Sequence, residues 1–221
     1  MANDAYIAVP VSGSGPGVLV LHAWWGLTDF FRGVCDRLAE AGFVALAPDL
    51  YGGATTATIA EAEQLSARLN DAAARAAMLD ALYQLRAHPG VRGEAVGVVG
   101  FSLGASYAYW LSAERPDAVA AVVVYYGTSD PDADYTRARA AYLGHYAAAD
   151  PYEPEEGVRQ LRAVLRAAGR PVTFHTYPGI GHWFAEDNRP DAYDPAAAAL
   201  AWERTLAFLR THLTTTDTKG A

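Results

Sequence analysis

One serine of this chain stands in a sequence pattern that can make it a nucleophile. Ser102 is the centre of Gly100-Phe101-Ser102-Leu103-Gly104, between an apolar segment at 95–99 and a helical pattern that begins at 103. In a strand-turn-helix context, this G-x-S-x-G motif projects the serine hydroxyl above the sheet, and small flanking residues let neighbouring backbone pass close. The Leu103 amide then points to where an oxyanion would form. The motif is frequent by chance in a chain with 20 glycines, so the prediction depends on this context.

A serine hydroxyl is a weak nucleophile at neutral pH, so a base must take its proton and an acid must orient that base. On a scaffold with this motif, the chain order is nucleophile, acid, histidine. His182 lies in a glycine-rich segment directly after an expected strand at 171–177, where a base can reach over the sheet edge. The other histidines after the serine have structural explanations or weaker positions: His145, His175 within a strand, and His212 within the last helix. We therefore predict that His182 is the base.

Asp150 is the predicted acid of this group. It follows an expected strand and precedes an expected helix at 155–168. The remaining acids have simpler interpretations. Three belong to a solvated loop, and three favour a helix N-terminus, where an acid stabilises the helix dipole by ~0.3–1 kcal/mol. These are Asp130, Asp132 and Asp134, and then Glu153, Glu155 and Glu156.

Strands and helices alternate along the chain, which predicts an α/β fold with an open, mostly parallel sheet and helices on both faces. The expected strands are 5–11 (an edge strand), 17–22, 43–47, 95–99, 118–125, 140–146 and 171–177. The expected helices are 29–41, 58–87 with a break near 70–71, 103–115, 155–168 and 195–212. Ligands of such sheets bind outside the carboxyl ends of the strands. We expect one domain over 1–213 and a flexible tail over 214–221.

Composition excludes several other classes of protein. The 221 residues carry a net charge of −8, which disfavours a nucleic-acid surface. No apolar run reaches the ~20 residues of a membrane-spanning helix. The N-terminus lacks a signal-peptide pattern, and Cys35 is the only cysteine, so we expect a soluble, cytoplasmic protein. The glycine-rich segment 13–17 leads to no helix, and the histidines share no metal-ligand spacing, so we predict no cofactor and no metal.

Five segments of the chain form a set with a recognisable order and spacing: Leu21-His22-Ala23-Trp24-Trp25-Gly26-Leu27, Ala47-Pro48-Asp49-Leu50-Tyr51-Gly52, Gly97–Gly104, Leu143–Tyr146 with Asp150-Pro151-Tyr152, and Tyr177-Pro178-Gly179 with Gly181-His182-Trp183-Phe184. Together they resemble the dienelactone hydrolase family of the α/β-hydrolase fold over nearly the whole chain. The resemblance implies an open sheet without a large lid domain, and hydrolysis of lactones and small esters by a nucleophile–Asp–His triad. It places the triad at Ser102, Asp150 and His182, and a second oxyanion donor at the backbone N–H of Trp24, beside that of Leu103.

The chain departs from that family in three respects. The family's elbow cysteine is Ser102 here, and its glutamate that pairs with the thiol is Ala23. Its arginine for the lactone carboxylate aligns with Glu186, and the second such arginine has only Arg68 and Arg75 as distant counterparts. Since Glu186 would present a negative group, we expect an uncharged small-molecule ester or lactone as substrate. The alternatives are acyl transfer or amide cleavage, and a non-catalytic binding protein on the same scaffold.

Aromatic residues crowd the loops that would form the site. Half of them are expected to be core packing and the others to form an apolar substrate pocket, with Trp24 and Trp183 as the side chains that touch substrate. The full set is Trp24, Trp25, Tyr51, Phe101, Tyr125, Tyr126, Trp183 and Phe184, of which we assign Trp25, Tyr51, Phe101, Tyr126 and Trp183 to the pocket. We expect a monomer or a small homo-oligomer.

Overall fold

The computed structural model describes residues 5–130 and 132–213. Its centre is a seven-stranded sheet in the order β1-β3-β2-β4-β5-β6-β7, in which only β1 is antiparallel to its neighbour. The strands are β1 (Tyr6–Ala8), β2 (Gly15–Leu21), β3 (Val44–Ala47), β4 (Val91–Phe101), β5 (Val119–Tyr125), β6 (Ala141–Ala147) and β7 (Val172–Tyr177). The prediction of a mostly parallel sheet is therefore confirmed.

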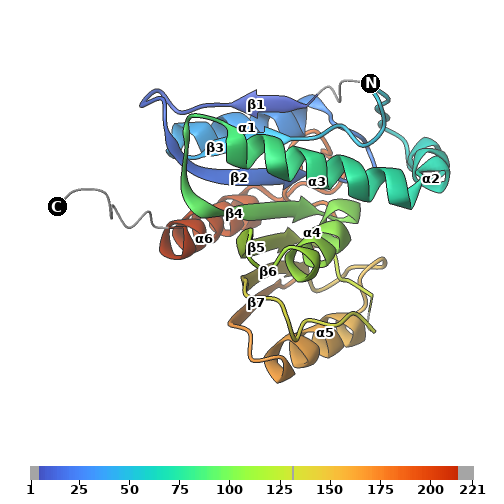
Figure 1. Ribbon diagram of the computed structural model, residues 1–221. Helices are drawn as coiled ribbons and strands as arrows, with labels where there is room; N and C mark the ends of the chain where they lie inside the picture. The colour runs from blue at the N-terminus through green and yellow to red at the C-terminus, as the bar shows by residue number, and fades with distance from the viewer. Residues whose placement is uncertain (1–4, 131, 214–221) are drawn as a thin grey trace.

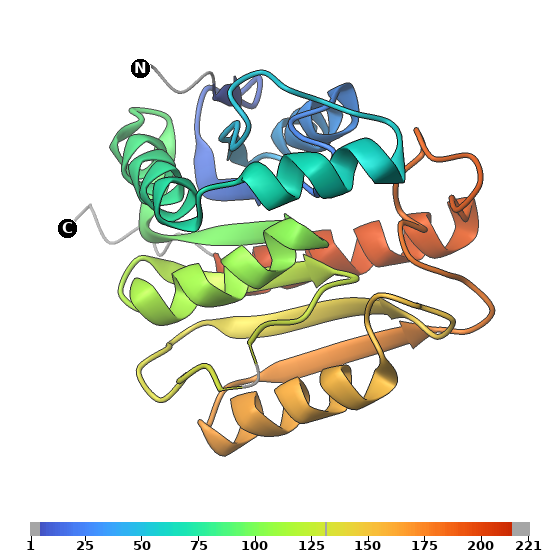
Figure 2. The same cartoon turned by 90° about the vertical axis from the view of Figure 1, so that its right-hand side faces the viewer.

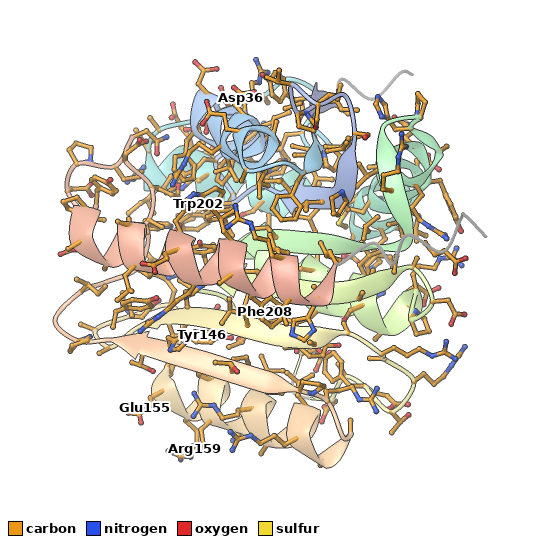
Figure 3. The ribbon with its side chains drawn as sticks, turned by 90° about the vertical axis from the view of Figure 1, so that its left-hand side faces the viewer. Asp36, Tyr146, Glu155, Arg159, Trp202 and Phe208 are labelled. Atoms are coloured by element: carbon orange, nitrogen blue, oxygen red, sulfur yellow. The ribbon has the colours of Figure 1, made fainter. Side chains whose placement is uncertain are left out.

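Helices cover both faces of this sheet (Figure 1). The helices are α1 (Asp29–Glu40), α2 (Ile59–Arg68), α3 (Asp71–Ala87), α4 (Leu103–Glu114), α5 (Glu155–Ala167) and α6 (Pro195–His212). α1 and α6 lie on one face, where Trp202 of α6 points towards α1 and Arg37 lies 4.1 Å from its ring centroid (Figure 3). α3, α4 and α5 lie on the other face. In the described residues no helical domain covers the sheet edge as a lid.

Two hydrophobic cores follow from the alternation of side chains along the buried strands. Val18 and Val20 of β2 pack with α1 and α6, whereas Leu19 and Leu21 of the same strand pack with α3 and α4. All four side chains are fully buried, as expected of a parallel strand with helices on both sides. The middle strands therefore form a rigid base for the loops at their ends.

Local capping residues decide where several helices begin. The Thr58 hydroxyl accepts the Glu61 N–H at the start of α2, and the Asn70 side chain accepts the Ala73 N–H (2.9 Å) at the start of α3. The predicted break near 70–71 is thus confirmed as a boundary between two helices. Asp194 caps α6 in the same way, with Pro195 as the first helical residue, which confirms that start as well.

The edge strand is shorter than predicted. A strand over 5–11 was expected, but pairing with β3 extends only over Tyr6–Ala8, because the chain turns back where the Gly13 N–H donates to the Pro10 carbonyl (2.7 Å). β4 is longer than the predicted 95–99, since its first residues pair with the start of β2. The tail predicted at 214–221 lies outside the described residues. No helix in the described part of the chain is long and apolar enough to span a membrane.

Candidate active site

The loops after β4, β6 and β7 leave the same edge of the sheet, because parallel strands end at a common edge (Figure 2). Ser102 follows β4, Asp150 follows β6 and His182 follows β7. The sheet therefore brings together three residues that are far apart in the sequence.

Ser102 occupies a strained turn between β4 and α4. Its φ is 49° and its ψ is −111°, a conformation that side-chain-bearing residues rarely adopt. Its N–H donates to the Tyr125 carbonyl (3.0 Å), and its own carbonyl accepts the Ala105 N–H (2.8 Å). A Cβ at Gly104 would collide with the backbone at the end of β2, and one at Gly100 would collide with the Gly104 carbonyl. This close packing explains why both flanking positions of the motif are glycine.

The three predicted side chains form a continuous hydrogen-bonded chain. Ser102 Oγ lies 2.9 Å from His182 Nε2, and His182 Nδ1 lies 2.7 Å from Asp150 Oδ2. The histidine and aspartate side chains are almost completely buried. The other oxygen of Asp150 accepts the backbone N–H groups of Tyr152 (2.9 Å) and Glu153 (3.1 Å). Since the carboxylate accepts the Nδ1 proton, Nε2 is left as the acceptor for the serine hydroxyl.

Two backbone N–H groups are free to serve as oxyanion donors. Leu103 is the first residue of α4, so its N–H has no partner within the helix. Neither this N–H nor that of Trp24 donates to any acceptor within 5–130 and 132–213. Both groups therefore remain candidates for the role predicted from the sequence.

The loop that carries Trp24 is held in place by a buried histidine. His22 Nδ1 donates to the Ala23 carbonyl (2.7 Å), and Nε2 accepts the Leu50 N–H (3.1 Å). Burial lowers the pKa of this imidazole, so His22 is neutral at pH 7. The side chain thus links the loop after β2 to the loop after β3 and has a structural role.

Aromatic side chains surround the candidate base. The Tyr152 ring lies 5.0 Å from the His182 ring and 5.2 Å from the Trp183 ring, and Trp24 stacks on Trp183 at 6.1 Å. Trp25 packs below them against Trp183 and is only 1 % exposed. Sequence reasoning missed Tyr152, although it belongs to the matched segment Asp150-Pro151-Tyr152, and it is the aromatic residue here that is most open to solvent, at 45 %.

Of the remaining residues predicted to line the pocket, one lies beside His182 and two do not. Tyr126 is fully buried and its ring lies 4.9 Å from the His182 ring. Phe101, in contrast, stacks on Tyr125 at 4.6 Å in the core beneath the elbow. Tyr51 packs against His22 at 5.3 Å. The structure thus brings Tyr126 to the candidate base, whereas Phe101 packs under the elbow and Tyr51 packs against His22.

The other acids and histidines have the following positions. The His145 imidazole is buried between the hydroxyls of Tyr177 (2.9 Å) and Thr205 (3.1 Å), with which it makes its hydrogen bonds. Glu153, expected to favour a helix N-terminus, instead accepts the Thr128 hydroxyl (2.7 Å) ahead of α5. The first-turn acids of α5 are Glu155 and Glu156, as predicted. No cluster of three metal-ligating side chains occurs in the part of the chain that the structure describes.

The expectation that Glu186 presents a negative charge to substrate is wrong. Its side chain is fully buried and accepts the Tyr126 hydroxyl (2.9 Å). Burial raises the pKa of Glu186 to about 8, so the carboxyl is mostly neutral at pH 7. Arg189, three residues further on, lies 4.0 Å from the Trp25 ring centroid and lines a cavity of 470 Å³. Arg75 is paired with Asp71 (2.7 Å).

These features define a class of protein: a mostly parallel α/β sheet with a strained serine elbow and a Ser–His–Asp arrangement at its edge. A metagenomic protein described as an alpha/beta hydrolase, MGS-M1, superposes with a TM-score of 0.73 at 15 % identity, over 95 % of this chain and 93 % of that one. The fold is therefore the α/β-hydrolase fold.

The comparisons also establish the family. Residues 3–213 match the profile of the dienelactone hydrolase family, so the chain belongs to that family and is a hydrolase of it. A Bradyrhizobium protein named "Probable 2-oxo-3-(5-oxofuran-2-ylidene)propanoate lactonase" is 31 % identical, over 95 % of this chain and 89 % of its own length. A dienelactone hydrolase-like promiscuous phosphotriesterase from metagenomic libraries superposes with a TM-score of 0.85 at 25 % identity, over 95 % of this chain and 92 % of that one.

Proposed function

We propose that this chain is a serine hydrolase that cleaves small, uncharged carboxylic esters or lactones through Ser102, His182 and Asp150. The observation that carries the proposal is the chain of two short contacts, 2.9 Å from Ser102 Oγ to His182 Nε2 and 2.7 Å from His182 Nδ1 to Asp150 Oδ2. A base in contact with the nucleophile and an acid in contact with the base are what nucleophilic catalysis by serine requires.

In the proposed reaction, His182 Nε2 takes the hydroxyl proton as Ser102 Oγ attacks the substrate carbonyl carbon. The Leu103 and Trp24 N–H groups bind the oxyanion of the tetrahedral intermediate; loss of one such donor typically lowers turnover by ~10²–10³. The intermediate collapses when the carbon–oxygen bond breaks, and Nε2–H protonates the departing alkoxide. In a lactone this opens the ring. Asp150 keeps the imidazole in the required tautomer and stabilises the imidazolium.

Water then completes the cycle. With His182 again as base, water attacks the acyl-enzyme and the product acid leaves, which restores the Ser102 hydroxyl. Added alcohol or amine would compete with water at this step, so product analysis with these acceptors separates hydrolysis from acyl transfer.

The aromatic surroundings of the base support an uncharged substrate. Trp24 and Tyr152 pack on Trp183 beside His182 and offer apolar ring surface there, whereas Trp183 itself is only 6 % exposed. Arg189 packs on the neighbouring Trp25, already donates to the Ala57 carbonyl (2.8 Å), and has a side chain that is 11 % exposed. A guanidinium that is largely covered and already engaged is a weaker partner for a substrate carboxylate than a free one, since it must give up existing contacts.

Covalent labelling tests the nucleophile, and a matched ester pair tests the substrate class. A fluorophosphonate probe is expected to add one adduct to the wild type and none to Ser102→Ala, as measured by intact mass. Phenyl acetate and its 4-carboxylate analogue differ by one charge, and we expect kcat/KM to favour the neutral ester at least tenfold. Preference for the anion, lost in Arg189→Met, would contradict the uncharged class. The absence of an adduct on the wild type would contradict the nucleophile itself.

A further inference from the structure

A closed ring of contacts connects Ser102 to His182 by a route outside the triad. The Ser102 N–H donates to the Tyr125 carbonyl (3.0 Å), and the next residue, Tyr126, donates its hydroxyl to Glu186 Oε1 (2.9 Å). The Glu186 N–H then donates to the Trp183 carbonyl (2.9 Å), directly after His182. The ring closes at the 2.9 Å contact between His182 and Ser102.

Tyr126 and Trp183, the two residues that Glu186 connects, both have strained backbone conformations. Tyr126 has a φ of 39° and Trp183 a φ of 64°, values that side-chain-bearing residues adopt at an energetic cost. The Tyr126 N–H donates to the His145 carbonyl (2.8 Å), which fixes its backbone to the sheet. Its ring lies 4.9 Å from the His182 ring and 5.5 Å from that of Phe184. Tyr126 is therefore a fixed surface beneath the turn that carries the candidate base.

We propose that Glu186 is a positioning residue, which ties the turn after His182 to Tyr126 and so holds the imidazole between Ser102 and Asp150. Glu186 is fully buried, and among the residues that the structure describes Tyr126 is the side chain that donates a hydrogen bond to it, while its second oxygen has no hydrogen-bond partner there. The inference rests on the proposed function, since it assigns Glu186 an effect on that triad.

The contact between Tyr126 and Glu186 depends on the protonation state of Glu186. Burial raises the pKa of Glu186 to about 8, against the lowering influence of the Tyr126 hydroxyl, the Arg189 charge and the Trp25 indole, while Asp187 raises it. The pKa of Tyr126 is raised well above its usual value by burial and by Glu186 and Asp150, so Tyr126 stays protonated. Below about pH 8 the carboxyl is neutral and fits its buried site. Above that pH it becomes a buried anion, which favours opening of the turn to water. We therefore expect kcat to fall as the pH rises through about 8.

Three single variants and one double variant separate a positioning role from a general packing role. Glu186→Leu and Tyr126→Phe each remove the hydrogen bond, and kcat at pH 7 is expected to fall at least tenfold with KM within twofold. Glu186→Gln keeps a side-chain oxygen that accepts the Tyr126 hydroxyl, so it should restore most of the kcat lost in Glu186→Leu. The double variant Tyr126→Phe/Glu186→Leu should be no worse than either single variant, because both remove the same contact.

The pH profile of kcat provides the second readout. The fall near pH 8 should be present in the wild type and absent in Glu186→Gln, which cannot ionise. Fluorophosphonate labelling of Ser102 is measured first in the wild type; without an adduct the proposed function itself fails. With an adduct, wild-type kcat in Glu186→Leu, or the same fall near pH 8 in Glu186→Gln, would overturn the role of Glu186 alone.

Discussion

Replacing Glu186 by glutamine is expected to change how the free energy of unfolding depends on pH. A free glutamate carboxyl ionises near 4.5, whereas the pKa of the buried Glu186 is about 8. Between these values the unfolded chain has released a proton that the folded chain still holds, so the wild type loses stability as the pH rises. One pKa unit corresponds to about 1.4 kcal/mol, so the loss reaches about 5 kcal/mol above pH 8.

Glu186→Gln cannot ionise and should not show this loss. The difference in unfolding free energy, variant minus wild type, should therefore rise by about 1.4 kcal/mol per pH unit between pH 5 and pH 8 and then level off. The buried histidines His22 and His145, whose pKa values are lowered by burial, are present in both proteins, so their effects cancel in the difference.

Urea unfolding at pH 5, 6, 7, 8 and 9, followed by far-ultraviolet circular dichroism, measures this difference. Glu203→Gln is the matched control, because it makes the same chemical change at an exposed position of α6. A difference for Glu186→Gln that does not change with pH would refute the reasoning, because it would mean that the Glu186 carboxyl ionises in the folded protein as easily as in the unfolded one.

The other predictions concern the nucleophile, the acid, the elbow and the aromatic cover. Ser102→Ala should lower kcat by at least ~10³ with an unchanged unfolding curve. Asp150→Asn should lower kcat by ~10²–10⁴, because the imidazole loses its required tautomer. Steady-state ester hydrolysis measures both, and an active Ser102→Ala would contradict the assignment. Gly104→Ala should destabilise the fold by about 3 kcal/mol, because its Cβ would collide with the end of β2. The matched Gly33→Ala, where nothing lies within 4 Å of the new Cβ in α1, should stabilise it by roughly 0.5–1 kcal/mol; equal urea midpoints for the two would oppose this explanation. Tyr152→Ala should raise KM for phenyl acetate about threefold to tenfold with kcat nearly unchanged, since it removes ring surface beside His182; an unchanged KM would show that the ring does not contact substrate.

Features that depend on neighbouring residues were predictable from the sequence. The alternation of strands and helices, the helix starts at 58 and 195, the break near 70–71 and the strand-turn-helix context of Ser102 all follow from short stretches of chain. The reach of the edge strand was not predictable in this way, because it depends on pairing with β3, which is distant in the sequence.

The candidate site shows the same division. Its residue types and their order along the chain are properties of the sequence, and they predicted Ser102, Asp150 and His182 as one group. The state of Glu186 is different, since the main cause of its raised pKa is burial, which exists only in the folded chain. The position of Tyr152 beside His182 likewise depends on how separate loops meet. The sequence by itself thus determined which chemical groups are present and which local turns hold them. The distances between these groups, their burial and their protonation were decided only by the tertiary structure, because desolvation and contact between distant segments arise only on folding.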